Sequence, residues 1–151
     1  MPNRQTHTTI GIITGVGVTA YRARHQSDQN ILLEMVGGGI GGYMSSRLPD
    51  VIEPASWPGH RQLAHSAATG AVIATTAYKL IGEWEEWCRS KAEYYHNRKS
   101  DETINWFEKF LYALLEILLH IASGTLSGLS AGYLSHLILD GCSPNGLPVF
   151  Q

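Results

Sequence analysis

The sequence predicts an all-α protein that folds as one helical bundle of about four or five helices. Long apolar segments are separated by short polar turns, and no run shows the alternation of apolar and polar residues that a strand requires. The length of 151 residues fits a single domain, residues 1–151, with enough side chains for a hydrophobic core. We therefore expect helices that bury their apolar faces against one another.

Composition excludes some functional classes. Charged residues make up 16% of the chain, against about 25% in an average soluble domain, so part of the surface is expected to meet a membrane or a second copy of the chain. The net charge of −2, without a basic run, argues against dedicated nucleic-acid binding. The N-terminal residues lack the order of a signal peptide, and two cysteines without a framework indicate a reducing compartment, so we do not expect secretion.

The first two helices are expected over residues 6–24, capped by Thr6 or Thr8, and over residues 31–47, preceded by Asp28 as N-cap. Five glycines between positions 37 and 42 interrupt the second segment. They allow two interpretations, a loop that cradles a phosphate or small residues that let another helix approach closely. The Lys-Ser/Thr of a P-loop and a preceding strand are both missing, which favours the helix.

The middle of the chain is predicted to form a loop followed by a third helix. Residues 48–59 contain three prolines, which are typical of a loop. The third helix is expected to open at His60 or Ser66 and to run through residue 81. Residues 84–102 are charged and aromatic, and they could extend this helix as a projecting amphipathic arm that reaches a membrane interface.

The last helical segment is expected over residues 103–140, with an N-cap in residues 100–102 and a break near residues 123–125 or 127–128. Residues 141–151 hold two prolines and are predicted to be irregular. No run of about 20 uncharged apolar residues is present. Because helices rich in small residues occur both in bilayers and in soluble cores, a buried helix and a membrane-inserted helix both remain open.

Two segments hold candidate ligands for a metal ion. In the C-terminal one, His136 and Asp140 are four residues apart, so a helix places them on one face. An imidazole and a carboxylate placed in this way can hold one ion or bridge two. The alternative is a histidine near a helix end beside an aspartate that caps the following turn.

The second candidate segment contains the proline-rich loop and the start of the third helix. Asp50 offers a hard oxygen ligand, and His60 and His65 offer imidazoles. Arg61 could clamp a phosphoryl group, and Glu53 could serve as a further ligand or as a general base. Each of these residues could instead be an ordinary solvated residue of a loop.

The remaining histidines differ in how well they fit the role of a metal ligand. His7, at the start of the first helix, is a candidate ligand only in combination with the two segments above. His25 and His96 stand in polar settings and are expected to be structural. His120 lies on an apolar face, which is more typical of a core residue with a satisfied ring than of a metal ligand.

The order of these motifs resembles the YdjM family. The matching pieces are Thr-His near the N-terminus, Leu-Pro-Asp, His-Arg-x-x-x-His-Ser, and Ser-His-x-x-x-Asp followed by Pro-x-Gly. That family is described as inner-membrane-associated metal-dependent hydrolases with a proposed repressor-binding role, and it is distantly similar to the all-α zinc phospholipases C and P1 nuclease. The resemblance implies metal ligands at His7, Asp50, His60, His65, His136 and Asp140. Family loops often read Pro-Asp-x-Asp, and Ile52 stands where the second Asp would fall, which leaves the number of ions open.

The expected function is a metal-dependent hydrolase of phosphodiester bonds, with a phospholipid-type substrate favoured over a nucleic acid. Divalent ions, zinc before manganese, would activate a water, with Asp50 or Glu53 as proton acceptor and Arg61 as a stabilising cation. One alternative is a non-catalytic, metal-stabilised module that binds a partner or a membrane. Another is a small membrane protein whose His and Asp residues line a pathway for ions or protons. The expected location is the bacterial inner membrane or the cytoplasm.

Overall fold

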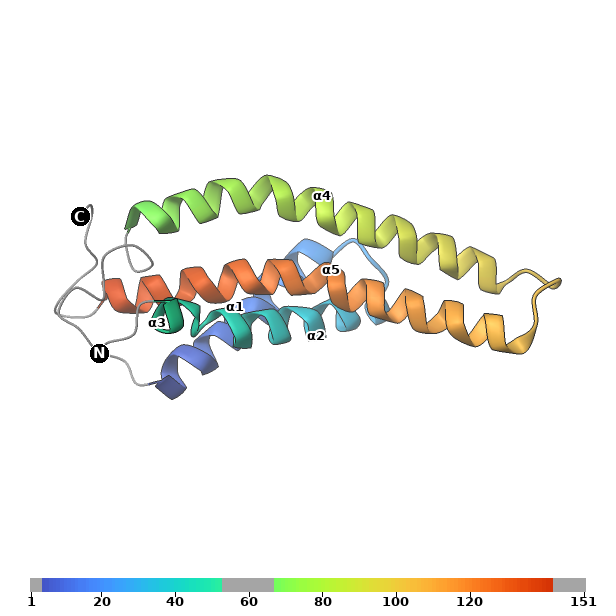
Figure 1. Ribbon diagram of the computed structural model, residues 1–151, viewed down its shortest axis with the longest axis horizontal. Helices are drawn as coiled ribbons and strands as arrows, with labels where there is room; N and C mark the ends of the chain where they lie inside the picture. The colour runs from blue at the N-terminus through green and yellow to red at the C-terminus, as the bar shows by residue number, and fades with distance from the viewer. Residues whose placement is uncertain (1–3, 53–66, 143–151) are drawn as a thin grey trace.

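The computed structural model describes residues 4–52 and 67–142, which form helices and, within these two ranges, no strand. The helices are α1 (Arg4–Ala23), α2 (Asp28–Ser45), the short α3 (Leu48–Ile52), α4 (Ala67–Lys99) and α5 (Trp106–Gly141). α5 runs through the middle of the molecule, with α4 along one side and α1 and α2 along the other (Figure 1). The predicted all-α class is confirmed.

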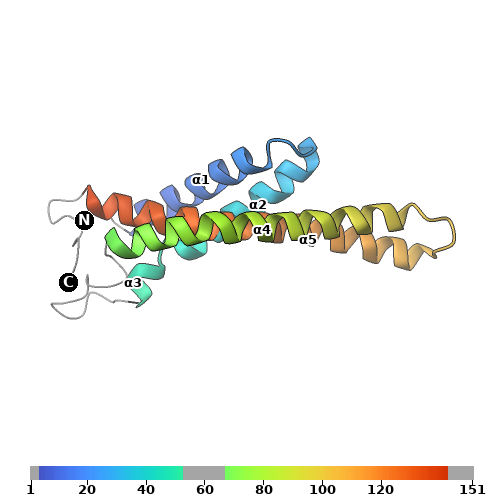
Figure 2. The ribbon, with the colours of Figure 1, turned by 90° about the horizontal axis from the view of Figure 1, so that it is seen from above.

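α4 and α5 form an antiparallel hairpin whose turn projects past the turn between α1 and α2 (Figures 1 and 2). The two helices have 33 and 36 residues, whereas α1 and α2 have 20 and 18. At 1.5 Å per residue, the hairpin is roughly 20 Å longer than the α1–α2 pair. In the turn, the carboxylate of Asp101 accepts hydrogen bonds from the hydroxyl and the backbone N–H of Thr103, at 2.7 and 2.9 Å, and these bonds lower its pKa.

Two helix caps differ from the expected ones. Ser27, not Asp28, caps α2, because the Ser27 hydroxyl accepts the backbone N–H of Asn30 at 3.3 Å. α5 begins after Asn105 rather than after residues 100–102. There the side chain of Asn105 accepts the N–H of Glu108 at 2.9 Å, and the Glu108 carboxylate accepts the N–H of Asn105 at 3.1 Å. This reciprocal pair satisfies two N–H groups that have no partner within the helix.

Threonines and a proline lie inside helices where the sequence suggested helix ends. The predicted cap at Thr6 or Thr8 is wrong, because α1 already begins at Arg4. The predicted loop over residues 48–59 is wrong for its first part, which forms α3, while residues 53–59 lie outside the described residues. Pro49 is tolerated in the first turn of α3 because its missing N–H would have no helical partner there.

The predicted break within residues 103–140 is also wrong, because α5 is continuous from Trp106 to Gly141. Its small residues form a contact surface. A Cβ added at Gly128 would overlap the carbonyl oxygen of Gly38, and one added at Gly41 would overlap that of Thr125. The glycine-rich segment is therefore a helix that lies backbone to backbone on α5, and the helical interpretation of residues 37–42 is confirmed.

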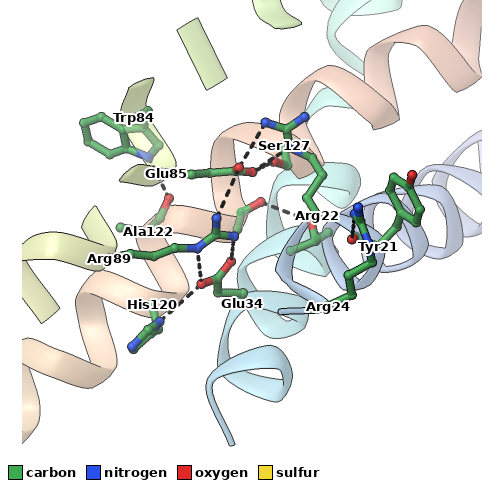
Figure 3. A network of polar contacts seen from close by, with 12 residues as sticks. Tyr21, Arg22, Arg24, Glu34, Trp84, Glu85, Arg89, His120, Ala122 and Ser127 are labelled. Carbon is green, nitrogen blue, oxygen red and sulfur yellow. Dashed lines mark hydrogen bonds and ion pairs between the residues drawn. The ribbon is translucent and has the colours of Figure 1, made fainter. Parts of the chain in front are cut away.

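A buried polar network joins α4 to the other long helices (Figure 3). Arg89 of α4 donates to both carboxylate oxygens of Glu34 on α2, and Nδ1 of His120 on α5 lies 3.2 Å from the same carboxylate. Arg22 of α1 donates to Glu85 of α4 at 2.8 and 3.0 Å. His120 and Glu34 are buried, so His120 occupies the core position that the sequence predicted. These charge pairs fix the position of α4 along the bundle axis relative to α1 and α2.

Candidate metal centre

Three helices bring two histidines and two aspartates together at one end of the bundle. His7 of α1 places Nε2 3.5 Å from Oδ1 of Asp140 on α5. His136, one turn before Asp140, places Nε2 3.5 Å from Oδ2 of Asp140 and 3.6 Å from Oδ1 of Asp50 on α3. One ligand atom from each of His7, His136 and Asp140 lies within 4.8 Å of the other two.

These separations fit a shared ion better than direct hydrogen bonds. N–H···O bonds are usually 2.7–3.2 Å long, so distances of 3.5 and 3.6 Å are long for such bonds. In a tetrahedral zinc site with bonds of about 2.0–2.2 Å, two ligand atoms lie roughly 3.4 Å apart. Each of the three nitrogen–oxygen distances is therefore close to one edge of such a tetrahedron, and the two distances to Asp140 end on different oxygens of its carboxylate.

The end of α2 fixes the orientation of His136. Its Nδ1 lies 2.6 Å from the carbonyl oxygen of Ser46, and a carbonyl can only accept, so Nδ1 carries the hydrogen. In a neutral imidazole, the other nitrogen, Nε2, then has the lone pair, and it faces the two aspartates. Ser46 follows the last residue of α2, where helix carbonyls have no partner within the helix. Metal-binding histidines commonly donate their second nitrogen in this way.

The cluster is buried, with one exposed member. His7, His136 and Asp140 are 4%, 0% and 2% exposed, whereas the side chain of Asp50 is 55% exposed. The rings of His7 and His136 stack with centroids 4.0 Å apart. Asp140 is a buried carboxylate beside a second, exposed one, and burying a carboxylate is costly unless a cation or hydrogen-bond donors compensate its charge. The donor set and its charge therefore fit a divalent cation.

The other predicted site residues lie outside the described residues. They are Glu53, His60, Arg61 and His65, all in the stretch between α3 and α4. The described residues on either side of that stretch are Ile52, the last residue of α3, and Ala67, the first residue of α4. Figure 1 shows α3 and the start of α4 at the end of the bundle where α5 ends. The described part of the chain therefore brings together His7, Asp50, His136 and Asp140 of the predicted ligand set.

Sequence reasoning missed two contributions. The carbonyl of Ser46 orients a ligand, and a backbone carbonyl has no signature in the sequence. The pairing of Glu34 with Arg89 was also missed, although Glu34 is the only acidic residue in residues 31–47. A single acid in an apolar helix was a usable signal, because a buried charge needs a partner.

The hydropathy of α5 and the comparison with known families both indicate a membrane protein. Among the described helices, α5 is long and apolar enough to cross a membrane, and 22% of its apolar 18-residue window is buried inside the bundle. No curated protein and no solved structure matches the chain. The family model described as YdjM inner membrane protein matches residues 1–151, so the chain belongs to this family and its predicted association with the inner membrane is confirmed.

Proposed function

We propose that this chain is a metal-dependent hydrolase that cleaves phosphodiester bonds, with a membrane phospholipid as the substrate class. The observation that carries the proposal is the set of nitrogen–oxygen distances of 3.5, 3.5 and 3.6 Å among His7, Asp50, His136 and Asp140. Membership in an inner membrane family supports a lipid as the substrate class. The distant similarity to zinc phospholipases that the sequence suggests stays a prediction.

Each member of the cluster has a role in this proposal. A bound zinc or manganese ion would supply a water with a lowered pKa, about 7 for zinc. His136 would hold the ion through Nε2 while its Nδ1 donates to the carbonyl of Ser46. Asp140 directs one oxygen to His136 and the other to His7, so it can bind one ion or bridge two. Asp50 is the exposed member, which suits it to accept a proton from the attacking water.

The remaining predicted residues complete the proposed site. His60 and His65 would be further ligands, Arg61 would stabilise charge on the phosphoryl oxygens, and Glu53 would be a second candidate base. The support for them is their position in the chain. They stand between α3, which carries Asp50, and the first turn of α4.

Two other functions differ from this one in observable ways. A metal-stabilised binding module needs a closed shell of ligands, whereas the exposure of Asp50 favours a shell that is open to solvent. An ion or proton pathway needs titratable groups along the bundle. The charges of Glu34 and Arg89 pair with each other, which favours a structural role for that network.

Metal content and turnover test the proposal together. Protein purified in mild detergent without a metal-binding tag is analysed by elemental mass spectrometry, and hydrolysis is followed with bis(p-nitrophenyl) phosphate and with phospholipid vesicles. We expect bound zinc or manganese in the wild type and its loss in His136→Ala and Asp140→Asn. Asp50→Asn should retain metal and lose about a hundredfold in rate, because a proton acceptor typically contributes that much or more.

The matched controls are His96→Ala and Asp101→Asn, which replace an exposed histidine and a partly exposed aspartate near the far turn of the hairpin. Both should keep metal and activity. A wild-type protein that stays free of metal after zinc and manganese are added would refute the hydrolase. Metal binding without turnover of either substrate would instead support the binding module.

A further inference from the structure

An open groove lies between α4 and α5. It has a volume of about 310 Å³ and is lined by five aliphatic side chains, which run from Val72 to Ile81 on α4 and include Leu126 on α5. Its two other lining residues are Thr76 and Ser130. The hydroxyl of Ser130 donates to the carbonyl of Leu126 in its own helix at 3.2 Å. The groove therefore presents an almost wholly apolar surface.

A second, larger groove shows how different the first one is. It has a volume of about 590 Å³ and is lined by charged and polar residues, among them Glu86, Arg89, His96 and Glu116. A charged or strongly polar ligand would find partners in this second groove and not in the apolar one. Among the described side chains that line the groove between α4 and α5, none is charged, which favours an apolar occupant.

The apolar groove points toward the metal cluster. α4 and α5 are antiparallel, and Gly70, in the first turn of α4, lies against Leu137, next to His136. Val72 is therefore at the cluster end of the groove, and Ile81 and Leu126 are at the far end. At 1.5 Å per residue the groove is about 14 Å long, and Ser130 precedes His136 by about 9 Å along the helix axis.

The environment of α5 indicates the occupant. The chain belongs to an inner membrane family, and α5 is the described helix that meets the length and hydropathy of a membrane span. Apolar side chains such as Leu118 and Ile138 are exposed on the same helix, as expected for a surface that faces lipid. An apolar groove open on a helix that spans a bilayer would be surrounded by acyl chains rather than by water or soluble peptides.

We propose that the groove between α4 and α5 holds one acyl chain of a membrane phospholipid, with the headgroup at the cluster end and the methyl end near Ile81 and Leu126. The position of the headgroup rests on the proposed function, because a phosphodiester must reach the cluster to be cleaved. Occupation of the groove by an acyl chain does not depend on hydrolysis.

Photo-crosslinking in membranes tests this proposal. Vesicles of phosphatidylethanolamine and phosphatidylglycerol carry a trace of phosphatidylcholine with a diazirine either near the carboxyl end or near the methyl end of one acyl chain. Labelled peptides are identified by mass spectrometry. We expect labelling of residues 72–81 and 126–130 to exceed labelling at Ile13, an exposed aliphatic residue of α1, several-fold. The carboxyl-end probe should favour Val72 and the methyl-end probe should favour Ile81 and Leu126.

Variants separate a specific site from general contact with lipid. Thr76→Trp, at an exposed position of the groove wall, should reduce labelling of the groove several-fold, and Ser130→Phe should do the same from α5. Ile13→Trp is the matched control and should leave it unchanged. Labelling that is equal at Ile13 and in the groove, that persists in both groove variants, or that shows the reversed order of the two probes would overturn the proposal.

The same experiment in Asp140→Asn distinguishes the two proposals. If the chain is not a hydrolase but the groove binds lipid, this variant and the wild type label the groove alike, and neither turns over a phosphodiester. If the chain is a hydrolase without an acyl-chain site, bis(p-nitrophenyl) phosphate is cleaved while labelling is spread evenly over the exposed aliphatic residues. The first result supports the acyl-chain site alone, and the second refutes it alone.

Discussion

A single carboxylate, that of Glu34, organises the polar interior of the bundle. It is fully buried, and it accepts hydrogen bonds from the guanidinium of Arg89, with the imidazole of His120 at 3.2 Å (Figure 3). Such a pair contributes little net stability compared with an apolar pair of equal volume, but removing one partner leaves the other charge uncompensated. We therefore expect a substitution of one partner to lower the free energy of unfolding more than a substitution of both partners.

Glu34→Gln is expected to lower the free energy of unfolding by about 2 kcal/mol, because it removes the carboxylate that pairs with Arg89 and leaves that guanidinium only the longer contact of 3.7 Å with Glu85. Denaturant titration in detergent micelles, followed by circular dichroism, measures this change. The double variant Glu34→Gln with Arg89→Met should recover part of the loss. Arg98→Gln breaks the exposed pair with Asp101 and should cost less than about 1 kcal/mol. Equal losses for the buried and the exposed pair would contradict the role given to Glu34.

At the same scale, spacing within one helix predicted contacts well, and contacts between helices were harder to predict. His136 and Asp140 were paired from their four-residue spacing, because helix geometry alone places them one turn apart. Asp50 was a candidate because its carboxylate is a hard oxygen ligand, but grouping it and His7 with α5 depended on a resemblance of motif order, since nothing local brings α1 and α3 to α5. The carbonyl of Ser46 could not be predicted, because its role depends on where α2 ends.

At the scale of helices, glycines determine how closely α1, α2 and α5 approach. Gly38 of α2 has Gly15 of α1 on one side and Gly128 of α5 on the other, and a Cβ at any of these three positions would overlap backbone atoms of the facing helix. Contact between backbones increases dispersion attraction and offsets the unfavourable helix propensity of glycine. This is how helices associate where the surrounding lipid provides no hydrophobic driving force.

Alanine substitutions at two glycines test this interface. Gly128→Ala should lower the free energy of unfolding by about 1–3 kcal/mol, since α2 and α5 must separate to admit the methyl group. Gly17→Ala is the matched control, because Gly17 is exposed on α1 with no atom within 4 Å of the added Cβ. It should raise stability by about 0.5–1 kcal/mol through helix propensity alone. Denaturant titration measures the free energy of unfolding of both variants. Destabilisation by both substitutions would contradict the proposed contact surface.

Most helices were predicted from the sequence, and the glycines of α5 explain where the prediction failed. Segments 6–24, 31–47 and 67–81 were predicted as helices, and the structure has α1, α2 and α4 there. The predicted break near residues 123–128 was wrong because serine and glycine were read as local breakers. Their effect depends on the facing helix, which fills the space that a side chain would take. Pro49 was misread in a similar way, since a proline in the first turn does not end a helix.

At the scale of the whole molecule, the cluster connects elements that are far apart in the chain. His7 comes from the start of α1, Asp50 from α3, and His136 and Asp140 from the end of α5. An ion bound to all four would link the two ends of the sequence at one end of the bundle, opposite the turn of the α4–α5 hairpin (Figure 2). Because this ligand set exists only in the folded chain, an ion bound to it would also stabilise the fold.

The proposed metal site predicts that a chelator lowers the thermal stability of the entire bundle. A ligand present at a thousand times its dissociation constant stabilises the folded state by about 4 kcal/mol, so chelation is expected to lower Tm by several degrees. Differential scanning fluorimetry in detergent, with and without a chelator and then with zinc restored, measures the shift. His7→Ala should show a smaller shift, because α1 then contributes no ligand from this position. Asp140→Asn should melt at one temperature in all three conditions, since it lacks the carboxylate that faces both histidines. A chelator shift in Asp140→Asn as large as in the wild type would place the stabilising metal elsewhere in the protein.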